Sequence, residues 1–161
     1  MKIAIVSDTH NNHITVKSAV EILRERNVSR VIHCGDICDV ETVRLFEGLT
    51  ADFVFGNCDY ERANLRLVMA EIGATLHEPF GHLDVEGVKL AFVHGDDPSL
   101  LEGLEYSGQF DFVFYGHTHM AREHRRGCTR VVNVGALYRA RTRTFGILDL
   151  ETRLLESITV P

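Results

Sequence analysis

Residues 31–36 read Val-Ile-His-Cys-Gly-Asp, a short apolar run that ends abruptly at a carboxylate. Four other stretches are built in the same way: residues 3–10 (IAIVSDTH), 53–59 (FVFGNCD), 90–96 (LAFVHGD) and 112–119 (FVFYGHTH). In each, apolar residues that are largely β-branched or aromatic lead into Gly, Asp, Asn or His. Such runs are typical of strands buried on both faces of a sheet. The five stretches together predict one functional site at the carboxyl edge of a sheet.

Length and charge limit the classes of function. The chain has 161 residues, the length of one ordinary domain, and we expect residues 1–161 to form a single domain. The formal net charge of −6 disfavours non-specific binding of nucleic acid through overall charge. A function that handles phosphate groups would therefore need local positive charge, from metal ions or from a cluster of arginines.

Targeting and cysteine patterns indicate a cytoplasmic protein. The apolar stretch at residues 1–6 is too short for the core of a signal peptide, and no run approaches membrane-spanning length. The four cysteines are few and irregularly spaced: Cys34, Cys38, Cys58 and Cys128. This pattern favours reduced thiols over a disulfide framework, and we expect neither Cys34 nor Cys38 to form a thiolate zinc site.

The first half of the chain alternates strands with amphipathic helices. Apolar residues at helical spacing predict helices at 15–27, 41–49 and 61–72, between strands at 2–6, 30–34 and 53–55. The second half is β-rich, with one short helix at 98–106 and predicted strands at 75–77, 82–86, 88–93, 111–115, 120–126, 129–134, 144–150 and 153–159. We expect its pairing to be mostly antiparallel. The predicted fold is mixed α/β (α+β), a four-layer α-β-β-α sandwich of two packed sheets flanked by helices.

Seven candidate metal ligands stand at the ends of the predicted strands: Asp8, His10, Asp36, Asn57, His94, His117 and His119. Asp8 and His10 are two residues apart, as are His117 and His119, and on extended backbone each pair would point to the same side. Oxygen donors mixed with imidazoles suit Mn²⁺, Fe²⁺, Zn²⁺ or Ni²⁺ better than Ca²⁺. Seven ligands exceed the needs of one ion, so the sequence predicts two ions that share a ligand. A pair of ions generates hydroxide near neutral pH and neutralises phosphoryl oxygens, which predicts hydrolysis at phosphorus.

The ordered motifs resemble those of a known family. Asp-x-His at 8–10, Gly-Asp at 35–36, Gly-Asn-x-Asp at 56–59, His-Gly at 94–95 and Gly-His-Thr-His at 116–119 resemble the calcineurin-like metallophosphoesterase superfamily. The short length and the Gly-Asn-Cys-Asp variant resemble its compact bacterial and archaeal phosphodiesterase branch. The resemblance covers residues 3 to about 137 and implies a two-sheet sandwich flanked by helices.

The resemblance also implies a division of the ligands between two metal ions. One ion would be held by Asp8, His10, Asp36 and His119. The other would be held by Asp36, Asn57, His94 and His117, with Asp36 bridging. In this branch the ion is commonly Mn²⁺, and Fe, Zn, Ni and Mg are the alternatives. Asp36, Asn57 and His94 would act in catalysis through the metals.

The chain departs from the family at two positions that concern the leaving group. Many members have His where this chain has Cys58, and that His is thought to help protonate the leaving group. Many also have a second His where this chain has Asp96. The family's Asn-Pro-Gly-Ser loop appears as residues 133–136 (NVGA), and Asn133 is expected to support the ligands from behind. With no confident general acid, we expect a preference for diesters with acidic leaving groups.

Several other residues have two readings each. Cys58 and Asp59 are candidates for supporting the ligands from behind, and Asp59 is equally a turn-forming residue. Asn11 would either contact substrate phosphate or cap a turn. Seven arginines lie between residues 122 and 143: Arg122, Arg125, Arg126, Arg130, Arg139, Arg141 and Arg143. A solvated hairpin face is the preferred explanation for them, and the alternative is a rim for an anionic substrate or a partner surface.

The sequence therefore predicts a dinuclear metal-dependent phosphodiesterase that acts on a small phosphodiester through a metal-bridging hydroxide. One alternative is a phosphomonoesterase or nucleotidase with the same metal site. The other is a non-catalytic protein-interaction scaffold, as in the metallophosphoesterase-like subunit of retromer. We expect no membrane partner and no non-specific nucleic-acid partner, and the β-rich edges of the second half would permit a homo-oligomer.

Overall fold

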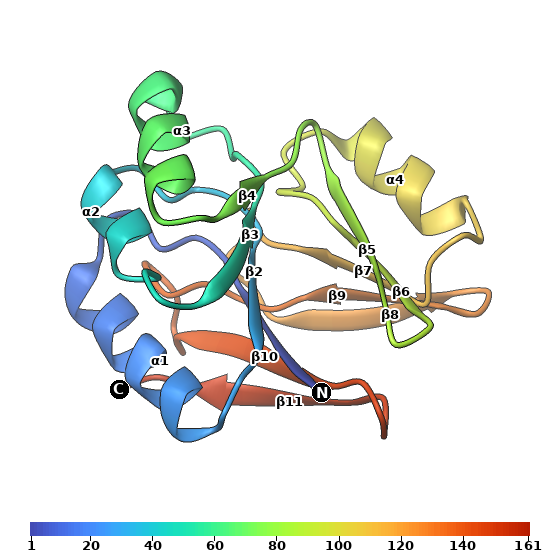
Figure 1. Cartoon of the computed structure of the whole chain (residues 1–161). Helices are drawn as coiled ribbons and strands as arrows, with labels where there is room; N and C mark the ends of the chain where they lie inside the picture. Colours follow the sequence, from blue (N-terminus) through green and yellow to red (C-terminus); the bar gives the residue numbers. More distant parts are fainter.

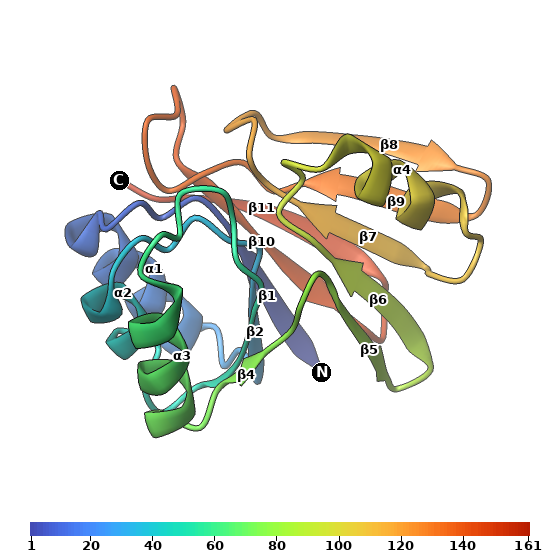
Figure 2. The ribbon, with the colours of Figure 1, turned by 90° about the horizontal axis from the view of Figure 1, so that it is seen from above.

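Two β-sheets pack face to face in the computed structural model, which describes residues 1–161 (Figures 1 and 2). The larger sheet contains β1 (Lys2–Val6), β2 (Arg30–His33), β3 (Thr50–Phe53), β4 (Thr75–Leu76), β10 (Thr144–Asp149) and β11 (Leu154–Thr159). The smaller sheet contains β5 (Gly81–Val85), β6 (Val88–Phe92), β7 (Phe112–Tyr115), β8 (Arg122–Arg126) and β9 (Thr129–Asn133). The strand orders are β11-β10-β1-β2-β3-β4 and β5-β6-β7-β9-β8.

The four helices complete the predicted four-layer sandwich. Three of them cover the outer face of the larger sheet: α1 (His13–Glu25), α2 (Val40–Arg44) and α3 (Arg62–Glu71) (Figure 2). The fourth, α4 (Pro98–Tyr106), packs on the outer face of the smaller sheet. No helix combines the length and apolar character needed to cross a membrane.

Three apolar clusters correspond to the three interfaces between the layers. Strand β1 shows the pattern, because Ile3 and Ile5 face the other sheet while Ala4 and Val6 face the helices. All four side chains are buried, which explains why the sequence reads as a continuous apolar run and does not alternate. The expectation of strands buried on both faces is confirmed.

The second half of the chain is less antiparallel than the sequence indicated. Strand β6 pairs in parallel with β7, and β7 pairs in parallel with β9. Helix α4 supplies the crossover between β6 and β7, and β8 forms an antiparallel hairpin with β9. Because β6 and β7 run in the same direction, the loops that carry His94 and His117 leave the sheet at the same edge.

Most element boundaries shift by one to three residues from their predicted positions. The largest difference is the helix predicted at 41–49, which ends at Arg44 and continues as turns. The strand predicted at 53–55 is β3 at Thr50–Phe53, and Val54 adds one backbone bond to His33. The short α2 begins after Asp39, whose carboxylate accepts the N–H of Thr42 and so satisfies a free donor of the first turn.

Two glycines test the packing of the smaller sheet and its helix. Gly81 faces Phe92 across the β5–β6 pair, and a Cβ at Gly81 would lie 2.0 Å from the buried Phe92 ring. We expect Gly81→Ala to lower the free energy of unfolding by about 1–3 kcal/mol through overpacking.

Gly103 lies exposed within α4, and a Cβ added there would meet nothing within 4 Å. Gly103→Ala should raise stability by about 0.5–1 kcal/mol. Urea denaturation measures both, and an unchanged midpoint for Gly81→Ala would contradict the packing argument.

Candidate metal centre

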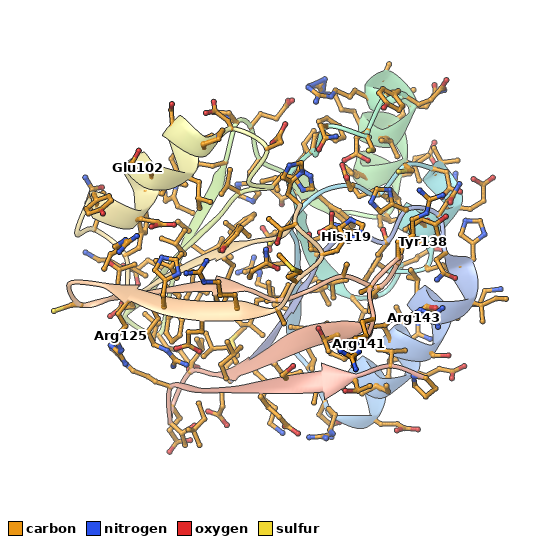
Figure 3. The ribbon with its side chains drawn as sticks, turned by 180° about the vertical axis from the view of Figure 1, so that it is seen from behind. Glu102, His119, Arg125, Tyr138, Arg141 and Arg143 are labelled. Carbon is orange, nitrogen blue, oxygen red and sulfur yellow. The ribbon has the colours of Figure 1, made fainter.

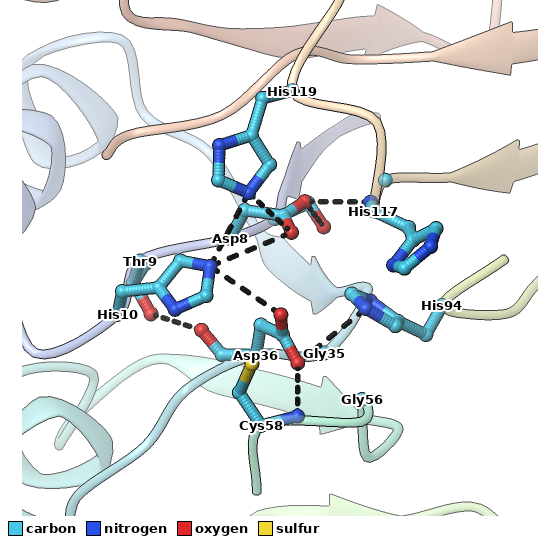
Figure 4. Close-up of polar contacts among 12 residues, drawn as sticks. Asp8, Thr9, His10, Gly35, Asp36, Gly56, Cys58, His94, His117 and His119 are labelled. Carbon is cyan, nitrogen blue, oxygen red and sulfur yellow. Dashed lines mark hydrogen bonds and ion pairs between the residues drawn. The ribbon is translucent and has the colours of Figure 1, made fainter. Parts of the chain in front are cut away.

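The predicted ligands converge in the loops that follow the parallel strands. Asp8 follows β1, Asp36 follows β2 and Asn57 follows β3, all from the larger sheet. His94 follows β6 and His117 follows β7, from the smaller sheet. The centre therefore lies where the carboxyl ends of both sheets meet, and each sheet supplies part of it (Figure 4).

One group of ligand atoms surrounds the imidazole of His10. Its Nε2 lies 3.2 Å from Nε2 of His119 and 3.3 Å from Oδ2 of Asp36. Nε2 of His119 lies 3.2 Å from Oδ1 of Asp8, and that oxygen lies 3.9 Å from Nε2 of His10. Two imidazole nitrogens and two carboxylates thus point toward a common space (Figure 4).

A second group lies on the other side of Asp36. Nε2 of His94 is 3.4 Å from Oδ1 of Asp36 and 3.1 Å from the side-chain oxygen of Asn57. The His117 ring lies beside the His94 ring, with 5.1 Å between their centroids. The two oxygens of Asp36 therefore face different imidazoles, Oδ2 toward His10 and Oδ1 toward His94.

One buried atom in the centre shows that these residues fit a cation. Asp8 is fully buried, and its Oδ1 has no hydrogen-bond partner. Its other oxygen accepts hydrogen bonds from Ser7 Oγ at 2.6 Å and from the backbone N–H of His117 at 2.9 Å. An unpaired buried carboxylate oxygen is costly, and a divalent ion between Asp8, His10 and His119 would satisfy it.

Neighbouring groups fix the orientation of the His94 ring and shift the pKa values of His10 and Asp36. Nδ1 of His94 donates to the backbone carbonyl of Cys34 at 2.8 Å, which directs Nε2 toward Asp36 and Asn57. Burial lowers the pKa of His10 despite the nearby charges of Asp36 and Asp8, so a neutral ring is favoured. Burial opposes ionisation of Asp36, but the hydrogen bond and charge of His94 outweigh it and lower the pKa of Asp36.

Asp59 ties together two of the loops that carry ligands. Its carboxylate accepts four backbone N–H groups, from Gly56 at 2.7 Å, Asp36 at 3.0 Å, Ile37 at 2.7 Å and Cys38 at 2.8 Å. Asp59 is 2% exposed, and burial raises its pKa against these hydrogen bonds. Of its two sequence-based readings, the one in which Asp59 orients a ligand agrees with these contacts.

The backbone of the ligand loops differs from the predicted extended form. Asp8, His10, Asp36, His117 and His119 all have positive φ, at 52°, 40°, 57°, 67° and 58°. The expectation that extended backbone aligns each pair is therefore wrong. Hydrogen bonds from the N–H of Asp8 to Gly35 O and from the N–H of His10 to Asp36 O hold the left-handed turns in place.

These turns separate His117 from His119. The His117 ring packs beside His94, and the His119 ring contacts His10 and Asp8. The two histidines consequently do not converge on one point, which differs from the same-side argument and agrees with the division implied by the family resemblance. Asn133 supports their loop, because its Nδ2 donates to Gly116 O at 2.6 Å and to Thr118 Oγ1 at 3.1 Å.

The cysteines and Asn11 have more limited contacts. Sγ of Cys58 lies within 4.8 Å of ligand atoms of His10 and Asp36, and its N–H donates to Asp36 Oδ1 at 2.8 Å. Cys34 is a buried core residue, as expected. All four cysteines are free. Asn11 lies in the turn before α1 with φ at 52°, and its backbone O accepts the N–H of His13 at 2.9 Å.

Two residues beside the centre carried no motif in the sequence. His33 is fully buried, and burial lowers its pKa to about 3. Its ring accepts the N–H of Gly35 at 3.2 Å and lies 3.1 Å from Thr9 Oγ1. Tyr138 packs against His10 with 5.3 Å between the ring centroids. The contacts with Thr9 and His10 join segments far apart in the sequence, so no local pattern revealed them.

Comparisons with known proteins identify the family of the chain. The family model of the calcineurin-like phosphoesterase superfamily domain matches residues 1–153. The chain belongs to this superfamily. A phosphodiesterase of Methanocaldococcus jannaschii is 34% identical to it over 165 residues, covering 99% of both chains. The predicted family is thereby confirmed.

Solved structures confirm the fold. An archaeal phosphodiesterase superposes with a TM-score of 0.92 at 33% identity and covers 99% of both chains. A phosphoesterase from E. coli has a TM-score of 0.74 at 19% identity over 100% of both chains. A Vps29 protein from Entamoeba histolytica has a TM-score of 0.66 at 17% identity over 99% of both chains. The last two show a shared fold alone.

Asp59→Asn tests whether the four backbone contacts position the metal ligands. An amide NH₂ would face N–H donors that the carboxylate now satisfies, and the loops after β2 and β3 would separate. We expect the affinity for Mn²⁺ to fall by about 10–100-fold. Isothermal titration calorimetry measures this, with Asp84→Asn at an exposed position of β5 as the matched control. Equal Mn²⁺ affinity in the Asp59 variant and the control would contradict a positioning role.

Proposed function

We propose that this chain is a phosphodiesterase that works with two divalent metal ions. The observation that carries the proposal is the placement of Asp36 between two groups of ligands. Its Oδ2 lies 3.3 Å from Nε2 of His10, and its Oδ1 lies 3.4 Å from Nε2 of His94. A carboxylate shared in this way suits two neighbouring cations.

Each cation would have its own set of protein ligands. Asp8, His10, Asp36 and His119 would hold the first, and Asp36, Asn57, His94 and His117 would hold the second. Mixed oxygen and imidazole donors favour Mn²⁺ and are compatible with Fe²⁺, Zn²⁺, Ni²⁺ or Mg²⁺. No lysine or arginine forms an ion pair with Asp8 or Asp36, so the bound ions would supply the positive charge that a phosphate requires.

The protein's part in the reaction is to hold the ligands rigid and the carboxylates ionised. When bound, two divalent ions lower the pKa of a water molecule for attack on phosphorus and neutralise the charge on the phosphoryl oxygens. Asp59 fixes the backbone beside Asp36, and the Cys34 carbonyl fixes the orientation of the His94 ring. Asn133 fixes the loop of His117 and His119. These contacts reduce the reorganisation that the site needs during the reaction.

Residues available to protonate the leaving group are weak candidates. Cys58 occupies the position where many relatives have His, and burial together with the charge of Asp36 raises the pKa of its thiol, which makes Cys58 a weaker proton donor than an ordinary thiol. Asp96 lies exposed in the loop after β6. The site should consequently favour diesters whose leaving groups need no proton.

Two alternatives use the same fold. A phosphomonoesterase would share the ligands and differ only in substrate. A protein-interaction scaffold would resemble the Vps29 structure, whose 17% identity shows the fold alone. The buried Oδ1 of Asp8, which has no hydrogen-bond partner, supports a bound metal ion. The complete set of seven candidate ligands favours an enzyme over a scaffold.

We also propose a domain organisation, a cellular location and an oligomeric state for the chain. We propose that residues 1–161 form a single domain, and the three apolar clusters that connect all four layers support this. A cytoplasmic location suits four free cysteines. The edge strands of the smaller sheet, β5 and β8, leave room for a homo-oligomer.

Replacement of the shared carboxylate tests the two-metal arrangement. We expect Asp36→Asn to reduce kcat on bis(p-nitrophenyl) phosphate with Mn²⁺ by at least about 100-fold, because an amide cannot bridge two cations. Asp39→Asn is the matched control, since Asn also caps α2 and the position lies outside the ligand set. Circular dichroism establishes that both variants fold. Undiminished turnover in Asp36→Asn would refute the mechanism.

A comparison of two aryl substrates tests the leaving-group argument. With Mn²⁺, kcat/KM for bis(p-nitrophenyl) phosphate should exceed that for diphenyl phosphate by about 100-fold or more, because general acid catalysis normally contributes about 10²–10⁴-fold, is weak here, and is needed more by phenolate than by p-nitrophenolate. The monoester p-nitrophenyl phosphate releases the same p-nitrophenolate as the first diester and therefore tests the monoester alternative separately. Removal of metal with EDTA should abolish both activities, and added Mn²⁺ should restore them. Faster cleavage of the monoester would instead favour the phosphomonoesterase alternative.

A further inference from the structure

A loop beside the metal centre carries three arginines without acidic partners. Residues 138–143, here called the arginine loop, contain Arg139, Arg141 and Arg143, all exposed. None of the three lies within 4 Å of a carboxylate. By contrast, Arg126 pairs with Glu105 and Arg130 pairs with Glu123. On the β8–β9 hairpin two arginines are thus paired and two, Arg122 and Arg125, are not, whereas all three arginines of this loop are unpaired.

The base of the arginine loop is attached to the metal centre. The ring of Tyr138 packs on His10 at 5.3 Å, and the guanidinium of Arg139 lies 5.1 Å from the centroid of the Tyr138 ring. Just before the loop, Leu137 O accepts a hydrogen bond from Asn12 Nδ2 at 3.2 Å, and Leu137 N donates to Ser7 O at 3.3 Å. A continuous stack therefore leads from a metal ligand to the first arginine.

The charges of this loop face the same side of the molecule as the metal centre. Figure 3 shows Tyr138, Arg141 and Arg143 on the face that also presents His119. Three cations on alternate residues repel one another, and the acidic Glu156 on β11 is paired with Arg26. The rest of the chain is acidic, with a formal net charge of −6. Because these three positive charges are not neutralised within the chain, an anion bound at the arginine loop would be stabilised.

Arginine suits phosphate because its planar guanidinium donates two parallel hydrogen bonds to phosphate oxygens. The scissile phosphate would already be held by the metal ions between His10 and His94. The arginine loop lies beyond His10, outward from that position, so its arginines would be free to bind a different anionic group. This step rests on the proposed function.

We propose that the arginine loop binds a second phosphate group of the substrate. The substrate class is then a small phosphodiester that carries one further phosphate on the side of Tyr138, such as a nucleotide diester with a terminal phosphate. The acidic remainder of the surface disfavours a long polynucleotide, which would need positive charge along an extended track.

A matched pair of substrates isolates the second phosphate. Thymidine 5′-(p-nitrophenyl phosphate) and its 3′-phosphorylated form contain the same scissile bond and release the same p-nitrophenolate. With Mn²⁺, the native protein should show a kcat/KM at least about tenfold higher for the 3′-phosphorylated form, since hydrogen bonds to charged groups favour binding. The double variant Arg141→Gln plus Arg143→Gln should lose this preference and keep its kcat/KM for the unphosphorylated form.

The control variant neutralises an arginine elsewhere on the same face. Arg125 on β8 is exposed and unpaired and lies away from Tyr138 in Figure 3, so Arg125→Gln should leave the preference unchanged. Binding provides a readout that does not need turnover. Calorimetry should show thymidine 3′,5′-bisphosphate binding more tightly than thymidine 5′-monophosphate, with the difference absent in the double variant.

The outcomes separate this inference from the proposed function. Equal kcat/KM for the two substrates, with aryl diester hydrolysis intact, would overturn the second phosphate site and leave the phosphodiesterase standing. No hydrolysis of either substrate would overturn the proposed function, while selective bisphosphate binding would still support the arginine loop. A 20-nucleotide single strand that bound more tightly than the bisphosphate, with a steep salt dependence, would overturn the small-substrate class.

Discussion

The centre of this structure depends on two buried carboxylates, Asp8 and Asp36, that no lysine or arginine of the protein neutralises. Asp8 is completely buried with one unpaired oxygen, and both oxygens of Asp36 face imidazoles. A cation bound between them would satisfy the buried Oδ1 of Asp8, which has no hydrogen-bond partner, and would add to the charge that His94 places beside Asp36. A metal ion that binds the folded chain and not the unfolded chain would stabilise the folded state through mass action. A metal ion at the sheet edge would therefore serve both the stability of the fold and the proposed function.

The surrounding structure serves to hold these carboxylates at a fixed separation. Left-handed turns at Asp8 and Asp36 are unfavourable for residues other than glycine, and they persist because non-local contacts fix them. Asp59 supplies three such contacts, to the backbone N–H groups of residues 36–38, and His33 adds a neutral hydrogen-bonding group behind the turn. Parallel pairing of β6 with β7 then brings His94 and His117 to the same edge. These hydrogen bonds and the parallel strand pairing together hold the candidate ligands in place and create a preorganised site.

Differences from the wider family concentrate around the metal ligands and not among them. Cys58 and Asp96 are the departures that concern the leaving group. In this chain the arginine loop also places positive charge beyond His10. The ligands set the type of reaction, because they determine which ions bind and where. Residues around them set which phosphate compounds fit. This division explains how one metal centre supports phosphodiesterases and other phosphoesterases on the same sandwich.

The amino-acid sequence was enough to predict the buried strands, the four layers and the seven candidate ligand residues, because apolar runs and the spacing of Asp, Asn and His are local patterns. Sequence alone did not show that His117 and His119 separate, that the second sheet is largely parallel at its centre, or that Asp59 joins two loops. The tertiary structure decided these features, since each depends on contacts between segments distant along the chain. Asp36 shows the reason most directly. One of its oxygens contacts His10, which follows a strand of the larger sheet, and the other contacts His94, which follows a strand of the smaller sheet.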